Sequence, residues 1–231
     1  CYLLEFDSFN ILIDFFEDTQ TKNEGEIHNR ILKESRPLYI LCTHHHHDHY
    51  NNVVLKWEQS YKGNLKYIFS TDVKEQYGVD KEGIIFLEKG DVHQDKHLSI
   101  KAFGSTDTGI SFLIRVGEQI IFHAGDLNNW HWREECPIEE SAMYERNYLK
   151  ELDDLAKETK HIDVAMFPID PRLGKDYMLG AEQFLDEIEV LLLAPMHFQD
   201  KFEALDPFKK YAETKQCQFF RPTKRGDSIK L

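Results

Sequence analysis

The sequence predicts an α/β (α+β) fold in which two β-sheets pack together with helices on the outside. Two observations support this prediction. β-Hairpin patterns and alternating strand–helix patterns occur in the same chain. Hydrophobic residues make up 41% of the 231 residues, enough for a sizeable core, and no linker, repeat or low-complexity stretch interrupts them. We therefore expect a single domain over residues 1–231.

The first half of the chain reads as a hairpin followed by alternating helices and strands. Residues 1–16 contain two β-rich runs around a turn at Asp7–Asn10. Further strands are expected at short apolar and aromatic runs, and helices where apolar residues recur at spacings of three and four. The expected strands are 38–43, 65–70 and 84–88, and the expected helices are 26–35, 52–61 and 72–78.

Three strand-like runs open the second half, and Gly117–Glu118 suits a tight hairpin between the second and the third. A long helix is expected after Pro137, because Tyr148, Leu152 and Leu155 fall on one face of it. Strands and helices then alternate to the end of the chain. The expected strands of this half are 98–103, 110–116, 119–124, 162–167, 190–195 and 217–220, and the later helices are 180–188 and 202–213.

Charge and cysteine usage limit the partners and the compartment. With 28 basic and 41 acidic residues the net charge is −13, and no Lys/Arg block stands out, so extended nucleic acid is not an expected partner. The longest uncharged run is far shorter than the roughly 18 apolar residues of a membrane-spanning helix, so no membrane partner is expected. Four scattered cysteines and no signal-peptide pattern predict reduced thiols and a cytoplasmic location. Whether the chain forms a homo-oligomer stays open.

A histidine cluster directly follows the expected strand 38–43. In the order His-x-His-x-Asp-His it offers His44, His46, Asp48 and His49. Side chains two residues apart in an extended segment point the same way, so the first two histidines can hold one metal ion. A turn after Asp48 would direct that carboxylate and His49 toward a second ion. An expression tag and a solvated loop are the alternative interpretations, but tags lie at chain termini.

Two later strands end in further candidate ligands. Asp126 follows a strand in FHAGDLNNW, and His197 follows one in LLLAPMHF. Taken singly, Asp126 is more typical of a helix cap and His197 of a structural histidine. Combined with the cluster, Asp126 can bridge two ions and His197 can join the second one.

These segments together resemble the metallo-β-lactamase-fold hydrolase superfamily. The resemblance extends over nearly the whole chain: a hairpin ending in Asp14, the His-x-His-x-Asp-His segment, Gly-Asp at 125–126 and the late His197. It implies a four-layer αββα sandwich with its site at one edge. Within the superfamily, IFHAGD and APMHF look most like the branch that contains ascorbate-6-phosphate lactonase.

The resemblance also implies a set of ligands. Carried over by position, these are His44 and His46 for the first ion, Asp48, His49 and His197 for the second, and Asp126 as a bridge. The implied cofactor is Zn²⁺, one or two ions, with Mn²⁺ or Fe as alternatives. A third histidine that the family usually adds to the first ion is missing from AFGSTDTGISF. Asp107 is the candidate oxygen ligand in its place, and the alternative is a weakened first site that fills only with substrate present or stays empty.

The implied chemistry is hydrolysis of a small-molecule substrate. A bound cation lowers the pKa of water from about 15.7 toward about 7, so that hydroxide is present at neutral pH. Asp48 and Asp126 are the expected catalytic residues, since their carboxylates can orient the water or transfer its proton. No Gly-x-Ser-x-Gly segment offers a serine nucleophile. The expected substrate is an anionic ester, lactone or phosphoester.

Residues of two loops are expected to bind this substrate. They are Trp130 and His131, just after Asp126, and Arg172, Lys175 and Tyr177 in a Pro/Gly-rich loop. The alternatives are packing for the aromatic residues and surface salt bridges for the cations. Two other functions also stay open. One is a phosphodiesterase or nuclease on the same fold, and the other is a metal-bound sensor without catalysis, suggested by the missing third histidine.

Overall fold

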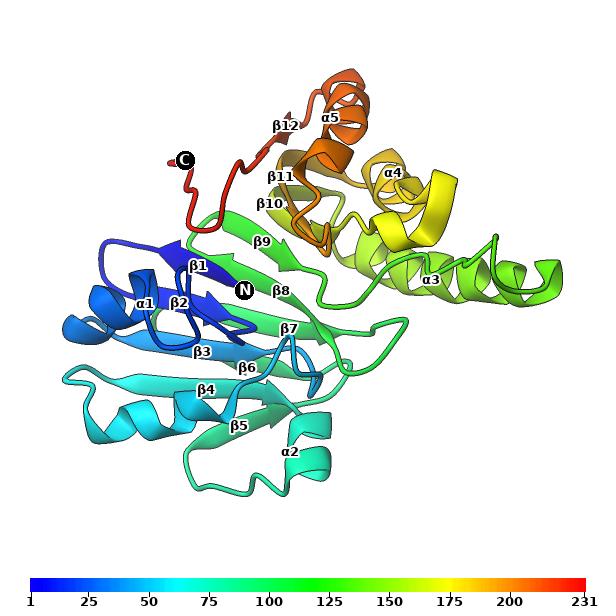
Figure 1. Ribbon diagram of the computed structural model, residues 1–231. Helices are drawn as coiled ribbons and strands as arrows, with labels where there is room; N and C mark the ends of the chain where they lie inside the picture. Colours follow the sequence, from blue (N-terminus) through cyan, green and yellow to red (C-terminus); the bar gives the residue numbers. More distant parts are fainter. The chain divides into compact units, whose positions relative to one another are not determined.

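The computed structural model describes residues 1–231, which form two compact units. The first unit comprises residues 1–88 and 224–228, and the second comprises 89–223 and 229–231. Each unit contains one β-sheet (Figure 1). None of the helices combines the length and the apolar character that crossing a membrane requires. The expectation of a single domain stays a prediction.

The sheet of the first unit has five strands in the order β1-β2-β3-β4-β5. The first two strands are antiparallel, which confirms the predicted hairpin, and the others pair in parallel through helical crossovers. Its strands are β1 (Tyr2–Glu5), β2 (Asn10–Ile13), β3 (Leu38–Cys42), β4 (Leu65–Ser70) and β5 (Ile84–Leu87), and its α-helices are α1 (Glu26–Asn29) and α2 (Thr71–Tyr77).

Two segments of this unit differ from the regular helices that were predicted. The predicted helix 26–35 breaks at Arg30, where φ is −125° and ψ is −65°, and continues as a 3₁₀ turn. Residues Asn52–Gln59 also form a 3₁₀ helix. A 3₁₀ helix aligns side chains three residues apart, and both Val54 and Trp57 are buried in the core. Local spacing does not separate this geometry from an α-helix.

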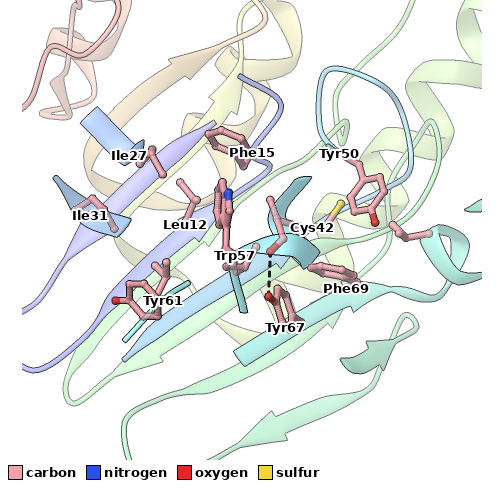
Figure 2. Packing of buried hydrophobic residues seen from close by; sticks show 14 residues of the cluster. Leu12, Phe15, Ile27, Ile31, Cys42, Tyr50, Trp57, Tyr61, Tyr67 and Phe69 are labelled. Carbon is pink, nitrogen blue, oxygen red and sulfur yellow. Dashed lines mark hydrogen bonds between the residues drawn. The ribbon is translucent and has the colours of Figure 1, made fainter. Parts of the chain in front are cut away.

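Apolar side chains of β2, β3 and β4 pack with the connecting segments in one cluster (Figure 2). The Trp57 ring stands edge-on to Phe15, with centroids 4.9 Å apart, an arrangement that aromatic rings favour. The buried hydroxyl of Tyr67 donates to the Val54 carbonyl at 3.0 Å, which satisfies its polar group. Burial, together with Glu58, raises the pKa of Tyr67 to about 12. The cluster fixes β3 and therefore the histidine segment that follows it.

The sheet of the second unit has seven strands in the order β12-β11-β10-β9-β8-β7-β6. Neighbouring strands from β6 to β9 are antiparallel, and those from β9 to β12 are parallel. Its strands are β6 (Val92–Gln94), β7 (Ser99–Phe103), β8 (Ser111–Val116), β9 (Gln119–His123), β10 (His161–Pro168), β11 (Glu189–Met196) and β12 (Gln218–Phe219). Its α-helices are α3 (Ile138–Glu158), α4 (Leu179–Glu187) and α5 (Leu205–Thr214).

Helix α3 buries Tyr148, Leu152 and Leu155, as its spacing predicts. Helix α4 stacks Phe184 on Phe167 of β10, with centroids 4.6 Å apart. The predicted helix 202–213 begins instead with a 3₁₀ turn before α5. Strand β6 was not predicted, because its three residues include polar and exposed ones. Helices α3, α4 and α5 provide the crossovers that place the ends of β9, β10 and β11 at one edge.

Candidate metal centre

Three adjacent parallel strands of the first unit end in polar side chains at the same edge of its sheet. Asp14 follows β2, the segment His44–His49 follows β3, and Asp72 lies in the first turn of α2 after β4. Strands β2, β3 and β4 lie side by side (Figure 1). The carboxyl ends of parallel strands are where open α/β sheets build their sites. A carboxylate therefore flanks the histidine segment on each side.

Asp14 holds the segment on the β2 side. Its Oδ1 accepts the Thr43 N–H at 2.7 Å, and its Oδ2 accepts the Thr43 hydroxyl at 2.7 Å. The Nδ1 of His49 lies 2.7 Å from the same Oδ2. Because a carboxylate only accepts, this ring carries its proton on Nδ1 and leaves Nε2 as a ligand atom. The sequence patterns gave Asp14 no role of its own.

The first two ligand candidates come together in the structure. His44 is fully buried, its Nδ1 lies 3.0 Å from the Thr43 hydroxyl oxygen, and its Nε2 lies 3.1 Å from Nδ1 of His46. Two nitrogen ligands at about 2.0–2.1 Å from a tetrahedral zinc ion are about 3.3 Å apart. The pair therefore has a separation that suits one ion.

Asp48 and His49 form a second pair. Nε2 of His49 lies 3.8 Å from Oδ2 of Asp48. The imidazole is only 6% exposed, whereas the carboxylate is 43% exposed. Asp48 is therefore accessible from solvent while His49 is held inside. His47, by contrast, is almost fully exposed.

The second unit has a similar arrangement at the end of its own parallel strands. Asp126 follows β9, Asp170 follows β10 and His197 follows β11, and these strands are adjacent. Nε2 of His197 lies 2.9 Å from Oδ1 of Asp126, and its Nδ1 lies 3.8 Å from Oδ2 of Asp170. His197 has a φ of 59°. Such a conformation is uncommon outside glycine and concentrates at functional sites.

Hydrogen bonds fix the loop that carries Asp126. The Thr106 hydroxyl donates to the Asn128 carbonyl at 2.6 Å, and its oxygen lies 3.0 Å from the Asn128 N–H. The indole N–H of Trp130 donates to the Asp126 carbonyl at 2.8 Å, and its ring stands edge-on to His197. Trp130 is nearly buried, so it packs against the two candidate ligands of this unit.

Asp107, the expected replacement for the missing histidine, lies on the loop after β7. It is exposed, and its backbone N–H donates to the Ser105 hydroxyl oxygen at 3.3 Å. Its role as a ligand stays a prediction.

The other expected substrate residues are held by protein atoms. His131 is fully buried: its Nε2 lies 3.1 Å from the Asp176 carbonyl, and its Nδ1 accepts the Arg133 N–H at 3.2 Å. The guanidinium of Arg172 pairs with the buried Asp170. The hydroxyl of Tyr177 donates to the carbonyl of Ala204 at 2.7 Å, and burial raises its pKa.

Lys175 is exposed at the rim of a cavity of about 180 Å³. Arg133 also lines this cavity, together with four other residues: Asp176, Met178, Leu179 and Glu182. Burial, with Asp186 and Asp176 nearby, raises the pKa of Glu182.

The donor chemistry of both units suits a divalent ion of the zinc type. Imidazole nitrogens and carboxylate oxygens are the mixed donors that Zn²⁺ and other first-row ions accept. In His44 and His49 the second ring nitrogen is held by a hydroxyl or a carboxylate, as is usual for metal-binding histidines.

Comparison with known proteins places the chain in a family. The family model described as the metallo-beta-lactamase superfamily matches residues 1–128, which is more than half of the chain. A search of the curated proteins finds no match.

Several solved structures resemble the whole chain. Igni18, a metallo hydrolase from Ignicoccus hospitalis, has 16% identity and a TM-score of 0.60, and the match covers 99% of this chain and 94% of that one. The metallo-beta-lactamase fold protein YhfI from Bacillus subtilis has 13% identity and a TM-score of 0.60, with coverage of 97% and 89%. A protein from Veillonella parvula described as a possible metal-dependent hydrolase has 10% identity and a TM-score of 0.60, with coverage of 99% and 95%.

These likenesses confirm the predicted fold class, which is α/β (α+β) of the metallo-β-lactamase type. The matched residues 1–128 include the hairpin, the histidine segment and Asp126. The expected class of protein, a metal-dependent hydrolase, agrees with this family. The chain belongs to the metallo-beta-lactamase superfamily.

Proposed function

We propose that the chain holds two metal ions and uses activated water to cleave a small anionic ester, lactone or phosphoester. The observation that carries the proposal is the pair of ligand sets at the carboxyl edges of the two sheets. His44 and His46 are the proposed ligands of the first ion. Asp48, His49 and His197 would hold the second, and Asp126 is the proposed shared ligand.

The number of protein ligands that an ion needs supports the proposed ligand assignment. Catalytic zinc usually has three protein ligands and an open position. Each pair in the first unit supplies only two: His44 with His46, and Asp48 with His49. Asp126 and His197 are the proposed further ligands, and Asp107 is the proposed additional oxygen ligand.

When bound, ions of this type activate water at neutral pH and stabilise negative charge on oxygen. The chain's own residues have the other tasks. Asp14 and Thr43 keep the imidazole rings oriented. Asp48 is the proposed group for proton transfer, because its exposed carboxylate is within reach of solvent and substrate. Asp126, which is nearly buried, is better suited to binding metal and orienting the water.

The cavity beside Lys175 supports an anionic substrate. Arg133 is already paired with Asp176 at 3.0 Å and with Glu145 at 3.4 Å, whereas no ion pair involves Lys175. An unpaired ammonium group at a cavity can bind a phosphate or carboxylate. Trp130, His131, Arg172 and Tyr177 remain proposed substrate contacts, and Nε2 of His131 lies 3.1 Å from the carbonyl of Asp176, which lines this cavity.

Zn²⁺ is the proposed ion, with Mn²⁺ or Fe as alternatives, because the donors are mixed nitrogen and oxygen. All four cysteines are free, which supports the proposed cytoplasmic location, since thiols stay reduced there. The likeness of IFHAGD and APMHF to the ascorbate-6-phosphate lactonase branch makes phosphorylated lactones the first substrates to assay.

The test is a substrate panel assayed after metal reconstitution. Protein purified without a nickel column is stripped with a chelator, loaded with zinc or manganese, and assayed with esters, lactones, phosphomonoesters and phosphodiesters. We expect turnover of an anionic ester or lactone, and a loss of about 100-fold or more in Asp48→Asn. His161→Ala, a partly exposed residue at the start of β10, is the control and should keep full activity.

Each other result has a defined meaning. Full activity in Asp48→Asn would refute the proposed mechanism. Turnover of phosphodiesters alone would favour the phosphodiesterase alternative. Metal binding without any turnover would favour a metal-bound sensor, the function that the missing third histidine suggests.

A further inference from the structure

Helix α2 (Thr71–Tyr77) anchors His45, the residue between the two proposed ligands of the first ion. The backbone N–H of His45 donates to Oδ2 of Asp72 at 2.9 Å, and its ring Nδ1 lies 2.7 Å from the same oxygen. The hydroxyl of Tyr77 donates to the His45 carbonyl at 3.0 Å. One short helix therefore holds both backbone polar groups of this residue and its ring.

The chemistry of these contacts makes them directional. A carboxylate only accepts, so the His45 ring carries its proton on Nδ1 and donates it to Asp72. Hydrogen bonds to an ionised acceptor are stronger than neutral ones. The two side chains are 25% and 19% exposed, so water screens the pair only in part. The His45 ring also packs against the ring of His46, with centroids 4.8 Å apart.

We propose that Asp72, His45 and Tyr77 form a positioning clamp that holds His44 and His46 in the geometry for one metal ion. Residues 45 and 46 form a bend after β3, so holding both backbone polar groups of His45 fixes the course of the chain at the two residues that flank it, His44 and His46. The two ligand nitrogens it would hold are 3.1 Å apart. The inference rests on the proposed function, since a clamp matters only if these histidines bind metal.

The composition of the first site makes such a clamp important. This chain has only two imidazoles there and no histidine in the segment where the family usually adds a third. With few ligands, any disorder in the pair lowers metal affinity directly, because binding must then also order the side chains. Asp14 fixes the same segment from the β2 side through Thr43 and His49, so the clamp supplies the fixing contact from β4.

The same unit contains a matched pair that lies next to no proposed ligand. Oδ2 of Asp18 accepts the backbone N–H of His28 at 2.8 Å and lies 2.7 Å from its Nδ1. The two contacts to Oδ2 match those of Asp72 with His45, while Oδ1 of Asp18 also accepts the backbone N–H groups of Thr19 at 2.7 Å and Ile27 at 3.1 Å. A variant of Asp18 therefore measures what such a pair contributes to stability alone.

The experiment measures zinc affinity by competition with a chromophoric chelator, with thermal unfolding of the metal-free proteins in parallel. The ion to follow is the one whose binding is lost in His46→Ala. We expect Asp72→Asn to lower the affinity for that ion by about 10- to 100-fold, which is the usual effect of removing a group that orients a ligand. Tyr77→Phe should weaken it less, and Asp18→Asn should lower the melting temperature without changing zinc affinity.

A rescue separates positioning from simple packing. His45→Asn keeps an N–H donor near the place of Nδ1, so it should retain more zinc affinity than His45→Ala. Equal affinity in wild type and Asp72→Asn, with a His46-dependent ion present, would overturn the clamp and leave the proposed function intact. If no bound ion depends on His46, the first site is wrongly assigned and the clamp fails with it. Wild type that binds no zinc at all would refute the proposed function itself.

Discussion

Replacing Asp14 by Asn tests whether the buried carboxylate sets the protonation of His49. Asp14 is 2% exposed and accepts two contacts from Thr43 and one from His49, each at 2.7 Å. An amide has one accepting oxygen and one donating nitrogen, so it cannot make all three contacts. Asp14 has a φ of 54°, a region that Asn also tolerates, so the substitution adds little backbone strain.

The expected magnitude follows from the contact that is lost. If the amide oxygen keeps the Thr43 N–H, its NH₂ faces Nδ1 of His49 and drives the ring proton to Nε2, the proposed ligand atom. The expected loss of zinc affinity is then about 10- to 100-fold, or roughly 1.4–2.7 kcal/mol. If the amide takes the opposite orientation, with its NH₂ group toward Thr43, the buried backbone N–H of Thr43 loses its acceptor. That would lower the free energy of unfolding by about 1–3 kcal/mol.

The assay combines zinc competition with urea unfolding of the metal-free protein. Asp80→Asn is the matched control, because Asp80 is exposed and pairs only with Lys74 at the surface. It should change neither quantity by more than a few tenths of a kcal/mol. An Asp14→Asn protein with wild-type zinc affinity and wild-type stability would refute the reasoning.

The remaining predictions concern the core, acid stability, substrate affinity and metal removal. Trp57→Ala should lower the free energy of unfolding in guanidinium by about 3–5 kcal/mol, because the indole ring fills the cluster of the first unit. A decrease of less than 1 kcal/mol would contradict this packing. Burial would raise the pKa of Asp18, but hydrogen bonds, chiefly from His28, outweigh it and hold that pKa below its usual value. Its stabilising effect is thus present above the unfolded-state pKa and is lost as pH falls through the folded-state pKa. The difference in unfolding free energy between wild type and Asp18→Asn should therefore shrink below about pH 4, and a constant difference would contradict the assignment. Lys175→Gln should raise KM for anionic substrates and leave kcat and the KM of neutral analogues unchanged. Chelation should lower the melting temperature reversibly, because zinc at about 100 times its Kd adds roughly 2.7 kcal/mol of stability.

Much of the fold follows from local patterns in the sequence. Strand β3 is a continuous apolar run, and the second half alternates strands and helices, so both sheets are predictable to within a few residues. The 3₁₀ geometry of Asn52–Gln59 is not predictable in this way, because Val54 and Trp57 would share a face in an α-helix as well. Short, exposed β6 has no hydrophobic signal and owes its existence to pairing with β7.

The candidate site can likewise be predicted from the sequence only in part. The histidine segment, Asp126 and His197 can be picked out because each follows an apolar strand and carries metal-binding chemistry. The contact between His45 and Asp72 joins residues 27 apart and exists only because β3 and β4 pair in parallel. The available signal for Asp72 was its position as an acidic residue just after a strand, which is also the position of Asp126.

The most direct test of the central claim is the number of zinc ions bound per chain, by elemental analysis, in wild type and in His197→Ala. Both proteins are purified without a nickel column and reconstituted with zinc. The account predicts two ions per wild-type chain and one in the variant, because His197 is a proposed ligand of the second ion. Wild type without bound zinc, or a variant with undiminished zinc content, would contradict it.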